Sequence, residues 1–158
     1  MAADRKTLAA VIGAPAAALL LVMVPQLEDT KRDPYLDIVK VPTVCTGHTG
    51  PEVVMGVRKT DAECAALLDG DLVKAATPLV ACMPQIKADP YFTAATVSLA
   101  FNVGPKAVCD GSVGRAFRAG RPAEGCAAIS RFVYAGGRIV PGLVNRRRVE
   151  RQLCERGL

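Results

Sequence analysis

Residues 27–50, LEDTKRDPYLDIVKVPTVCTGHTG, contain the most informative pattern in the chain. Charged residues follow directly on a long uncharged segment, and the second half of the stretch is rich in Val, Thr and Gly. In residues 37–42 the side chains of Asp37, Val39 and Val41 alternate with those of Ile38, Lys40 and Pro42. Two glycines and a proline, which are typical of turns, follow within residues 47–51. This pattern predicts a small antiparallel sheet or hairpin within residues 34–59.

Signals for helices come after this β region. Thr60, with Glu63 three residues later, forms a capping box that begins a helix through about Ala81, and Pro78 is placed to kink that helix or end it early. Further helices are predicted from Asp89-Pro90 to Gly104, near 111–119, from Pro122 to about Tyr134 with Gly136-Gly137 as its stop, and from Pro141 to the C-terminus. A small β region followed by several helices indicates an α+β fold.

The composition excludes several classes of protein. The chain has 158 residues, which fit one domain with an appendage. Because 51% of the residues are hydrophobic and only 22% are charged, intrinsic disorder is excluded. Trp is absent and aromatics make up 4%, so the core must be aliphatic. The net charge of +5 indicates an anionic partner, which could be nucleic acid, membrane or cell wall.

The cysteines are even in number and dispersed. They are Cys45, Cys64, Cys82, Cys109, Cys126 and Cys154. Because they form no CxxC pair and the chain has a single histidine, a zinc site is disfavoured and no metal is expected. Dispersed cysteines in a small chain instead predict disulfides and an oxidising compartment. The placement of the predicted elements favours the pairs Cys45–Cys64, Cys82–Cys109 and Cys126–Cys154, although the sequence alone leaves the connectivity open.

The N-terminal segment offers a route to such a compartment. Arg5 and Lys6 precede an uncharged stretch, residues 7–27, that is about as long as a membrane-spanning helix. A cleaved signal peptide is disfavoured because no small-residue cleavage site follows the apolar LLLVMV run. A core helix of a cytosolic protein is disfavoured by the cysteines and the basic flank. We therefore expect an uncleaved anchor, weakened by its Ala, Gly and Pro content, with the rest of the chain outside the cytoplasm.

Glu28, Asp37 and Thr43 carry the candidate chemistry. Eight residues separate the first two and five separate the last two. Hydrolysis of a glycoside needs a carboxylic acid to protonate the leaving oxygen and a second carboxylate across the bond, about 6.5–9.5 Å away in an inverting enzyme. A hydroxyl nearby can orient the attacking water. Spacing alone is weak evidence, because exposed carboxylates are usually solvated charges.

The same stretch resembles the phage-type lysozymes, which are muramidases with a Glu-x8-Asp-x5-Thr active site followed by a Gly-His-Thr segment. The similarity continues in order through TDAECAALLDGDL (60–72), SLAFNVG (98–104) and RFVYAGGRIVPGLVNRRRVERQLC (131–154), and so covers about residues 26–155. It implies a lysozyme-like fold, in which a substrate cleft lies between a small antiparallel β lobe and a larger helical lobe. It also implies hydrolysis of the β-1,4 bond between N-acetylmuramic acid and N-acetylglucosamine in peptidoglycan.

The resemblance also implies roles for residues. By matched position, Glu28 is similar to the general acid, Asp37 to the second carboxylate that places or activates water, and Thr43 to its hydroxyl partner. Pro42 stands where relatives often have Trp, and Phe132 replaces the Trp usual before the YAGG-like segment, so core and cleft packing depart from the family pattern. No cofactor is implied.

With its uncharged start, the chain looks like the signal-anchor-release endolysins of phages that infect Gram-negative bacteria. This implies a releasable anchor, residues 1–27, and a muramidase domain, residues 28–158. The protein would be held in the host inner membrane through residues 7–27, facing the periplasm, and become a soluble periplasmic monomer after release, lysing the host cell. Because the anchor contains no cysteine, control by disulfide exchange is not expected.

Other polar residues are expected to have structural or binding roles and not catalytic ones. His48 is expected to be structural and paired with Asp71 across the lobes. Asn102 either caps its helix or lines the cleft. The basic C-terminal residues are Arg146, Arg147, Arg148 and Arg151. Because no aromatic stacking platform accompanies them, no nucleic-acid partner is expected. They are interpreted as attracted to the anionic wall and membrane, with part of the run forming a solvated helix face.

Two alternative functions stay open. A lytic transglycosylase cuts the same bond without water and typically relies on one Glu, so Asp37 and Thr43 favour hydrolysis. A non-enzymatic, disulfide-stapled cationic protein that disturbs membranes would also fit the charge and the cysteines. The ends of the cleaved glycan distinguish the first alternative, and the absence of any turnover would indicate the second.

Overall fold

The computed structural model describes residues 5–158. Its α-helices are α1 (Leu8–Ile12), α2 (Ala14–Leu27), α3 (Asp61–Cys82), α4 (Pro90–Val103), α5 (Pro105–Asp110), α6 (Ser112–Arg118), α7 (Pro122–Ala128) and α8 (Pro141–Glu155). Short 3-10 helices are η1 (Pro84–Ala88) and η2 (Ile129–Arg131). The strands are β1 (Lys31–Leu36), β2 (Pro42–Cys45), β3 (His48–Thr49), β4 (Tyr134–Ala135) and β5 (Arg138–Ile139).

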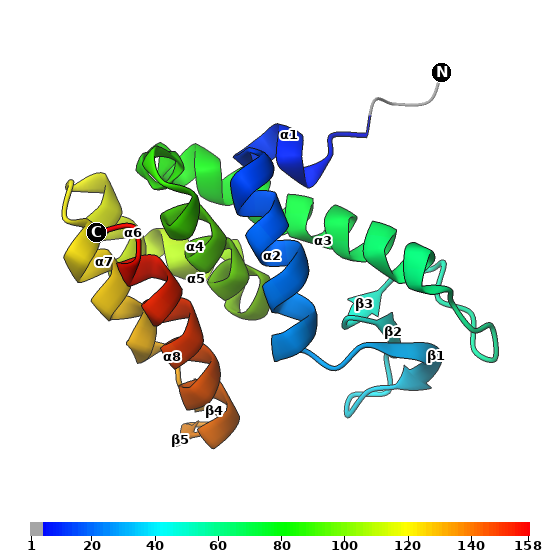
Figure 1. Ribbon diagram of the computed structural model, residues 1–158. Coiled ribbons are helices and arrows are strands. Elements are labelled where there is room, and N and C mark those ends of the chain that lie inside the picture. Colours follow the sequence, from blue (N-terminus) through cyan, green and yellow to red (C-terminus); the bar gives the residue numbers. More distant parts are fainter. Residues whose placement is uncertain (1–4) are drawn as a thin grey trace.

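The elements form two lobes joined by the long helix α3 (Figure 1). One lobe is built on the antiparallel sheet β1–β2–β3, in which Tyr35 lies opposite Thr43 and Val44 lies opposite His48. The other lobe gathers the remaining helices around α4, which packs against α2, α3 and α8. This confirms the predicted α+β, lysozyme-like architecture.

The predicted hairpin is confirmed, but most of the alternating residues lie in its turn and not in its strands. Residues 37–41 form the turn between β1 and β2, in which Lys40 has φ 65° and Ile38 is 100% exposed. The Asp37 carboxylate accepts the backbone N–H groups of Val39 and Val41, both at 2.9 Å, and so closes the turn. Side chains that alternate in the sequence therefore face solvent here, because this turn chemistry outweighs β propensity.

The helix signals that act within a few residues are confirmed. Thr60 Oγ1 accepts from the Glu63 backbone N–H, and the Glu63 carboxylate accepts from the Thr60 N–H, which completes the capping box of α3. Asp89 caps α4 through the Tyr91 N–H at 2.7 Å. Pro78, expected to kink or end α3, is contained within a helix that continues to its predicted end. The short helix α5 was not predicted.

The predicted helix from Pro122 to about Tyr134 is wrong in its second half. Helix α7 ends at Ala128, and the chain then forms the β4–β5 hairpin, in which Tyr134 pairs with Ile139. Gly136 and Gly137 have φ values of 57° and 75° and form the turn of this hairpin. Two consecutive positive φ angles are typical of a type I′ hairpin turn, so these glycines are not a helix stop.

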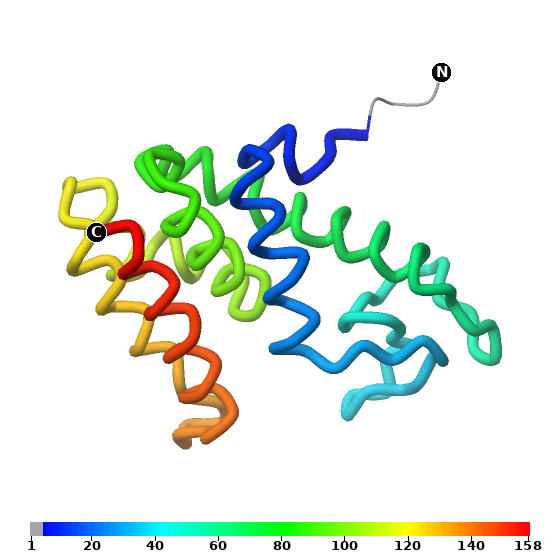
Figure 2. The backbone as a smooth tube through the Cα atoms, viewed as in Figure 1, coloured from blue at the N-terminus to red at the C-terminus, as the bar shows by residue number. Residues whose placement is uncertain are grey.

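The uncharged N-terminal stretch is divided into two helices at Gly13, whose φ is 88°. Leu8 of α1 and Leu20 and Val24 of α2 are completely buried in the core of the helical lobe. Fully burying such a side chain contributes about 1.5–3 kcal/mol. Figure 2 shows the blue N-terminal tube running alongside the helical lobe before it enters the β lobe. Within residues 5–158, no helix is both long enough and apolar enough to span a membrane.

Three disulfides connect the elements, in the pairing expected from element placement: Cys45–Cys64, Cys82–Cys109 and Cys126–Cys154. The first joins the β lobe to α3, within the small core that it forms with Val44 and Val53. The second ties the end of α3 to α5, and the third joins α7 to α8. Each stabilises the fold by about 2–4 kcal/mol.

Candidate active site

A cavity of about 490 Å³ lies between the lobes. Its walls include Glu28 after α2, Thr46 and Gly47 between β2 and β3, Asp71 on α3 and Asn102 on α4. Residues distant in the sequence therefore converge on one cleft from both sides. The cleft is open to solvent and is bordered by the carboxylates of Glu28 and Asp71.

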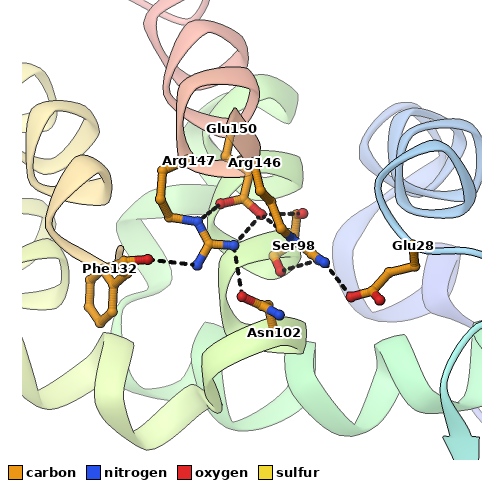
Figure 3. A network of polar contacts seen from close by, with 7 residues as sticks. All are labelled: Glu28, Ser98, Asn102, Phe132, Arg146, Arg147 and Glu150. Carbon is orange, nitrogen blue, oxygen red and sulfur yellow. Dashed lines mark hydrogen bonds and ion pairs between the residues drawn. The ribbon is translucent and has the colours of Figure 1, made fainter. Parts of the chain in front are cut away.

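Glu28 is positioned by the end of α2. Its backbone N–H donates to the Val24 carbonyl at 2.9 Å, which holds the residue at the C-terminal end of the helix. Its side chain is 30% exposed and borders the cleft. The carboxylate accepts a hydrogen bond from Nη1 of Arg146 on α8 (Figure 3). Glu28 thus combines a fixed orientation with access to solvent.

Asp37 and Thr43 meet at Val41. Asp37 accepts the Val41 N–H, its own N–H donates to the Val41 carbonyl at 3.1 Å, and the buried Thr43 hydroxyl donates to the same carbonyl at 3.0 Å. Among the residues described, the cavity wall that contains Glu28 includes neither of them. The structure therefore assembles Asp37 and Thr43 as a pair within the hairpin, whereas Glu28 reaches the cleft from the helical lobe.

His48 links the lobes, as expected. It is buried, with Nδ1 2.6 Å from Asp71 Oδ2 and Nε2 2.7 Å from Glu52 Oε1. Asp71 also pairs with Lys74 at 3.3 Å. Because both ring nitrogens are engaged by carboxylates, His48 joins the β lobe to α3 and is not available as a catalytic base.

The basic C-terminal helix forms a solvated face only in part, as expected, because Arg148 is exposed. Arg146 and Arg147 are buried, at 6% and 1% exposure, so they are not part of a solvated face. Both pair with Glu150, which is completely buried on the same helix. Arg147 also donates to Asn102 Oδ1 at 2.9 Å and so holds a residue of the cleft wall (Figure 3). Asn102, for which two positions were expected, lines the cleft.

Burial dominates the electrostatics of this network. Loss of solvent raises the pKa of the Glu150 carboxyl, while Arg147, the Ser98 hydroxyl and Arg146 act in the opposite direction. Burial likewise lowers the pKa of the Arg147 guanidinium, against the attraction of Glu150. Removing Glu150 would leave two buried arginines without the carboxylate that they share, and an uncompensated buried charge typically costs about 3–5 kcal/mol.

Sequence reasoning missed Arg146, Arg147 and Glu150 as parts of the site. The signal was present in the spacing: the carboxylate follows the two arginines at i+4 and i+3, where helical side chains share a face. That spacing is equally common on solvated helices, so it could not indicate burial. Within residues 5–158, no group of three or more His, Cys, Asp and Glu side chains is arranged to hold a metal ion.

The family model for phage lysozyme matches residues 25–150. The SAR-endolysin of Enterobacteria phage P21 is 39% identical over 158 residues, which cover 95% of this chain and 94% of that protein. The SAR-endolysin of Escherichia phage Mu is 39% identical over 124 residues, covering 78% of this chain and 71% of that protein.

Solved structures of a phage endolysin have the same fold as this chain. The active form of the P1 phage endolysin Lyz superposes with a TM-score of 0.79 at 26% identity, over 93% of this chain and 86% of that chain. The secreted inactive form of the same protein superposes with a TM-score of 0.53 at 28% identity, over 68% and 76% of the two chains. The match over nearly the whole length, together with the two-lobed fold and its cleft, means that this chain belongs to the phage lysozyme family of glycoside hydrolases.

Proposed function

We propose that this chain is a phage endolysin that hydrolyses the β-1,4 bond between N-acetylmuramic acid and N-acetylglucosamine in peptidoglycan, after export and release from a membrane anchor. The observation that carries the proposal is the position of Glu28, which Arg146 orients at a cleft bordered by both lobes. Family membership supports the identity of the bond that is cut, and the position of Glu28 at the cleft supports its assignment as the residue that faces this bond.

Glu28 acts as the general acid and protonates the leaving oxygen of the glycosidic bond. Its side chain is partly exposed, so the carboxyl can approach a bound glycan and exchange its proton with solvent. Asp37 supplies the second carboxylate, which places or activates the attacking water, and Thr43 supplies the hydroxyl beside it. The hydrogen bonds of both residues at Val41 support this pairing, because they make the position of one depend on the other.

The N-terminal segment acts first as a membrane anchor and then as part of the enzyme. Its residues 7–27 carry no charge, and two relatives that match 95% of this chain are named SAR-endolysins. In the structure the segment has its apolar side chains in the helical core. This arrangement corresponds to the released enzyme, and the better superposition on an active endolysin form supports the assignment.

Release and catalysis are coupled through Glu28. It directly follows α2, so a segment held in the bilayer would also hold Glu28 at the lipid surface, away from Arg146. A misplacement of about 1 Å can cost about a hundredfold in rate. The anchored protein in the host inner membrane is therefore inactive, and the soluble periplasmic protein degrades the wall.

The test is Glu28→Gln, compared with Glu124→Gln as a matched change on an exposed residue of α7. Glu28→Gln should fold normally and lose lytic activity, because an amide cannot donate the proton. Peptidoglycan digested by the wild type should carry reducing ends. Anhydro ends would show that the enzyme is a lytic transglycosylase. A Glu28→Gln protein that clears cell walls at the wild-type rate would rule out the assigned acid.

A further inference from the structure

The guanidinium of Arg146 is held on three sides. Nη1 donates to Glu28, Nε donates to Glu150 Oε1 at 3.1 Å, and Nη2 donates to the Ser98 carbonyl at 3.5 Å. These partners come from the end of α2, from α8 itself and from α4. Because the guanidinium is planar and rigid, the two inner contacts determine the direction in which Nη1 points.

Glu150 is the centre of the inner contacts. It is completely buried, and its Oε1 accepts from the Ser98 hydroxyl at 2.7 Å and from Arg147 Nη2 at 3.2 Å as well as from Arg146. Its Oε2 lies 2.8 Å from Arg147 Nε in an ion pair that does not meet hydrogen-bond geometry. One carboxylate therefore organises two arginines, and Figure 3 shows their side chains diverging from it.

The two arginines lead from Glu150 to different walls of the cleft. Arg146 reaches Glu28, and Arg147 reaches Asn102. If the Glu150 carboxylate served only to neutralise one buried positive charge, a single arginine would be a sufficient partner. Here two positive charges share it, and the second negative charge of the network is Glu28 itself.

We propose that Glu150 is a positioning residue for the hydrolysis: with the Ser98 hydroxyl, it fixes the Arg146 guanidinium so that Glu28 is held in the orientation from which it protonates the leaving oxygen. The proposal rests on the assignment of Glu28 as the general acid. Without the carboxylate at position 150, Arg146 keeps its contact to Glu28 but loses the two-point attachment that directs it, and Glu28 samples unproductive orientations.

The decisive variants are Glu150→Gln and Ser98→Ala. The first removes the charge while keeping the volume, and the second removes one hydrogen bond to Glu150 without touching either arginine. Each variant is assayed on soluble glycan fragments for kcat and KM, with the folded fraction measured by thermal unfolding. We expect kcat per folded molecule to fall about tenfold or more for Glu150→Gln and severalfold for Ser98→Ala, with KM unchanged, because misorientation affects the chemical step more than binding.

Glu155→Gln is the matched control, because Glu155 also pairs with an arginine of α8 but is 40% exposed and lies outside the network. Its kcat should equal that of the wild type. A Glu150→Gln protein that is merely less stable, with unchanged kcat per folded molecule, would overturn the proposal. Should Glu150→Gln fail to fold, Ser98→Ala decides the question, and an unchanged kcat in that variant overturns the proposal.

The two assignments fail separately. An active Glu28→Gln would refute the general acid, whatever the Glu150 variants do. An inactive Glu28→Gln combined with a fully active Glu150→Gln would leave the general acid intact and refute only the positioning role.

Discussion

The backbone N–H of Leu8 donates to the carboxylate of Asp69 on α3, at 3.3 Å to Oδ2 and 3.4 Å to Oδ1. This contact joins the first turn of α1 to a helix 61 positions further along the chain. The Leu8 side chain beneath it is completely buried. A carboxylate at the N-terminus of a helix satisfies a free N–H and complements the helix dipole. Under the proposed release from the membrane, Asp69 would be the residue that accepts the first turn of the N-terminal segment.

We predict that Asp69→Ala slows conversion to the soluble form. Leaving the Leu8 N–H without its acceptor in a partly buried position costs about 1–3 kcal/mol in the released state only. The measurement is the ratio of membrane-bound to soluble protein over time after an uncoupler is added to cells. Asp69→Asn is the control, since its amide oxygen can accept the same N–H. Equal release of the Ala variant and the wild type would contradict the prediction.

Gly13→Leu should trap the protein in the membrane and keep it inactive. The change makes the segment more apolar, and it places a side chain at φ 88° and ψ 150°, a backbone conformation that is essentially restricted to glycine and costs other residues about 1–3 kcal/mol. Ala18→Leu, on the exposed face of α2, adds apolar surface without the backbone constraint, so it should be released more readily. Cell fractionation before and after uncoupling checks both variants. Rapid release of Gly13→Leu would disprove the role of this break.

Asp37→Asn should abolish most of the activity while leaving the hairpin intact. The amide oxygen can still accept the N–H groups of Val39 and Val41, but an amide cannot serve as a base. Asp37→Ala should be inactive and should also loosen the turn. Turnover and thermal unfolding of the two variants separate these effects. Substantial turnover by Asp37→Asn would show that the second carboxylate is not Asp37.

The contribution of Glu52 to stability should disappear in acid. The hydrogen bond from its own backbone, followed by that to His48, lowers the pKa of Glu52 from the ordinary value of 4.5. A carboxyl whose pKa is lower in the folded state stabilises the fold above the unfolded pKa, and this contribution is lost as the pH falls through the folded value. The difference in unfolding free energy between wild type and Glu52→Gln should therefore shrink as the pH falls below 4.5. A difference that stays constant from neutral to acid pH would contradict this.

Part of the fold is decided by signals that act over a few residues. The capping box at Thr60 and Glu63 and the Asp89 cap depend on side chains that reach their own backbone, so the helix starts could be predicted from the sequence. The turn of residues 37–41 and the hairpin around Gly136 could not. A pair of glycines such as Gly136-Gly137 provides positive φ angles, which are common both at the end of a helix and in a hairpin turn. Only the pairing of Tyr134 with Ile139 shows that these glycines form a hairpin turn.

The α+β class, the family and the candidate residues could be predicted without the structure, because a motif preserves the order of the groups that the chemistry needs. The candidate residues are Glu28, Asp37 and Thr43. Only the tertiary structure decided that Arg146 binds Glu28 from 118 positions away and that Glu150 is buried beneath it. Charged side chains on a helix are ordinarily solvated. They become interior when distant elements bring opposite charges and a hydroxyl to the same place, and no local pattern encodes that meeting.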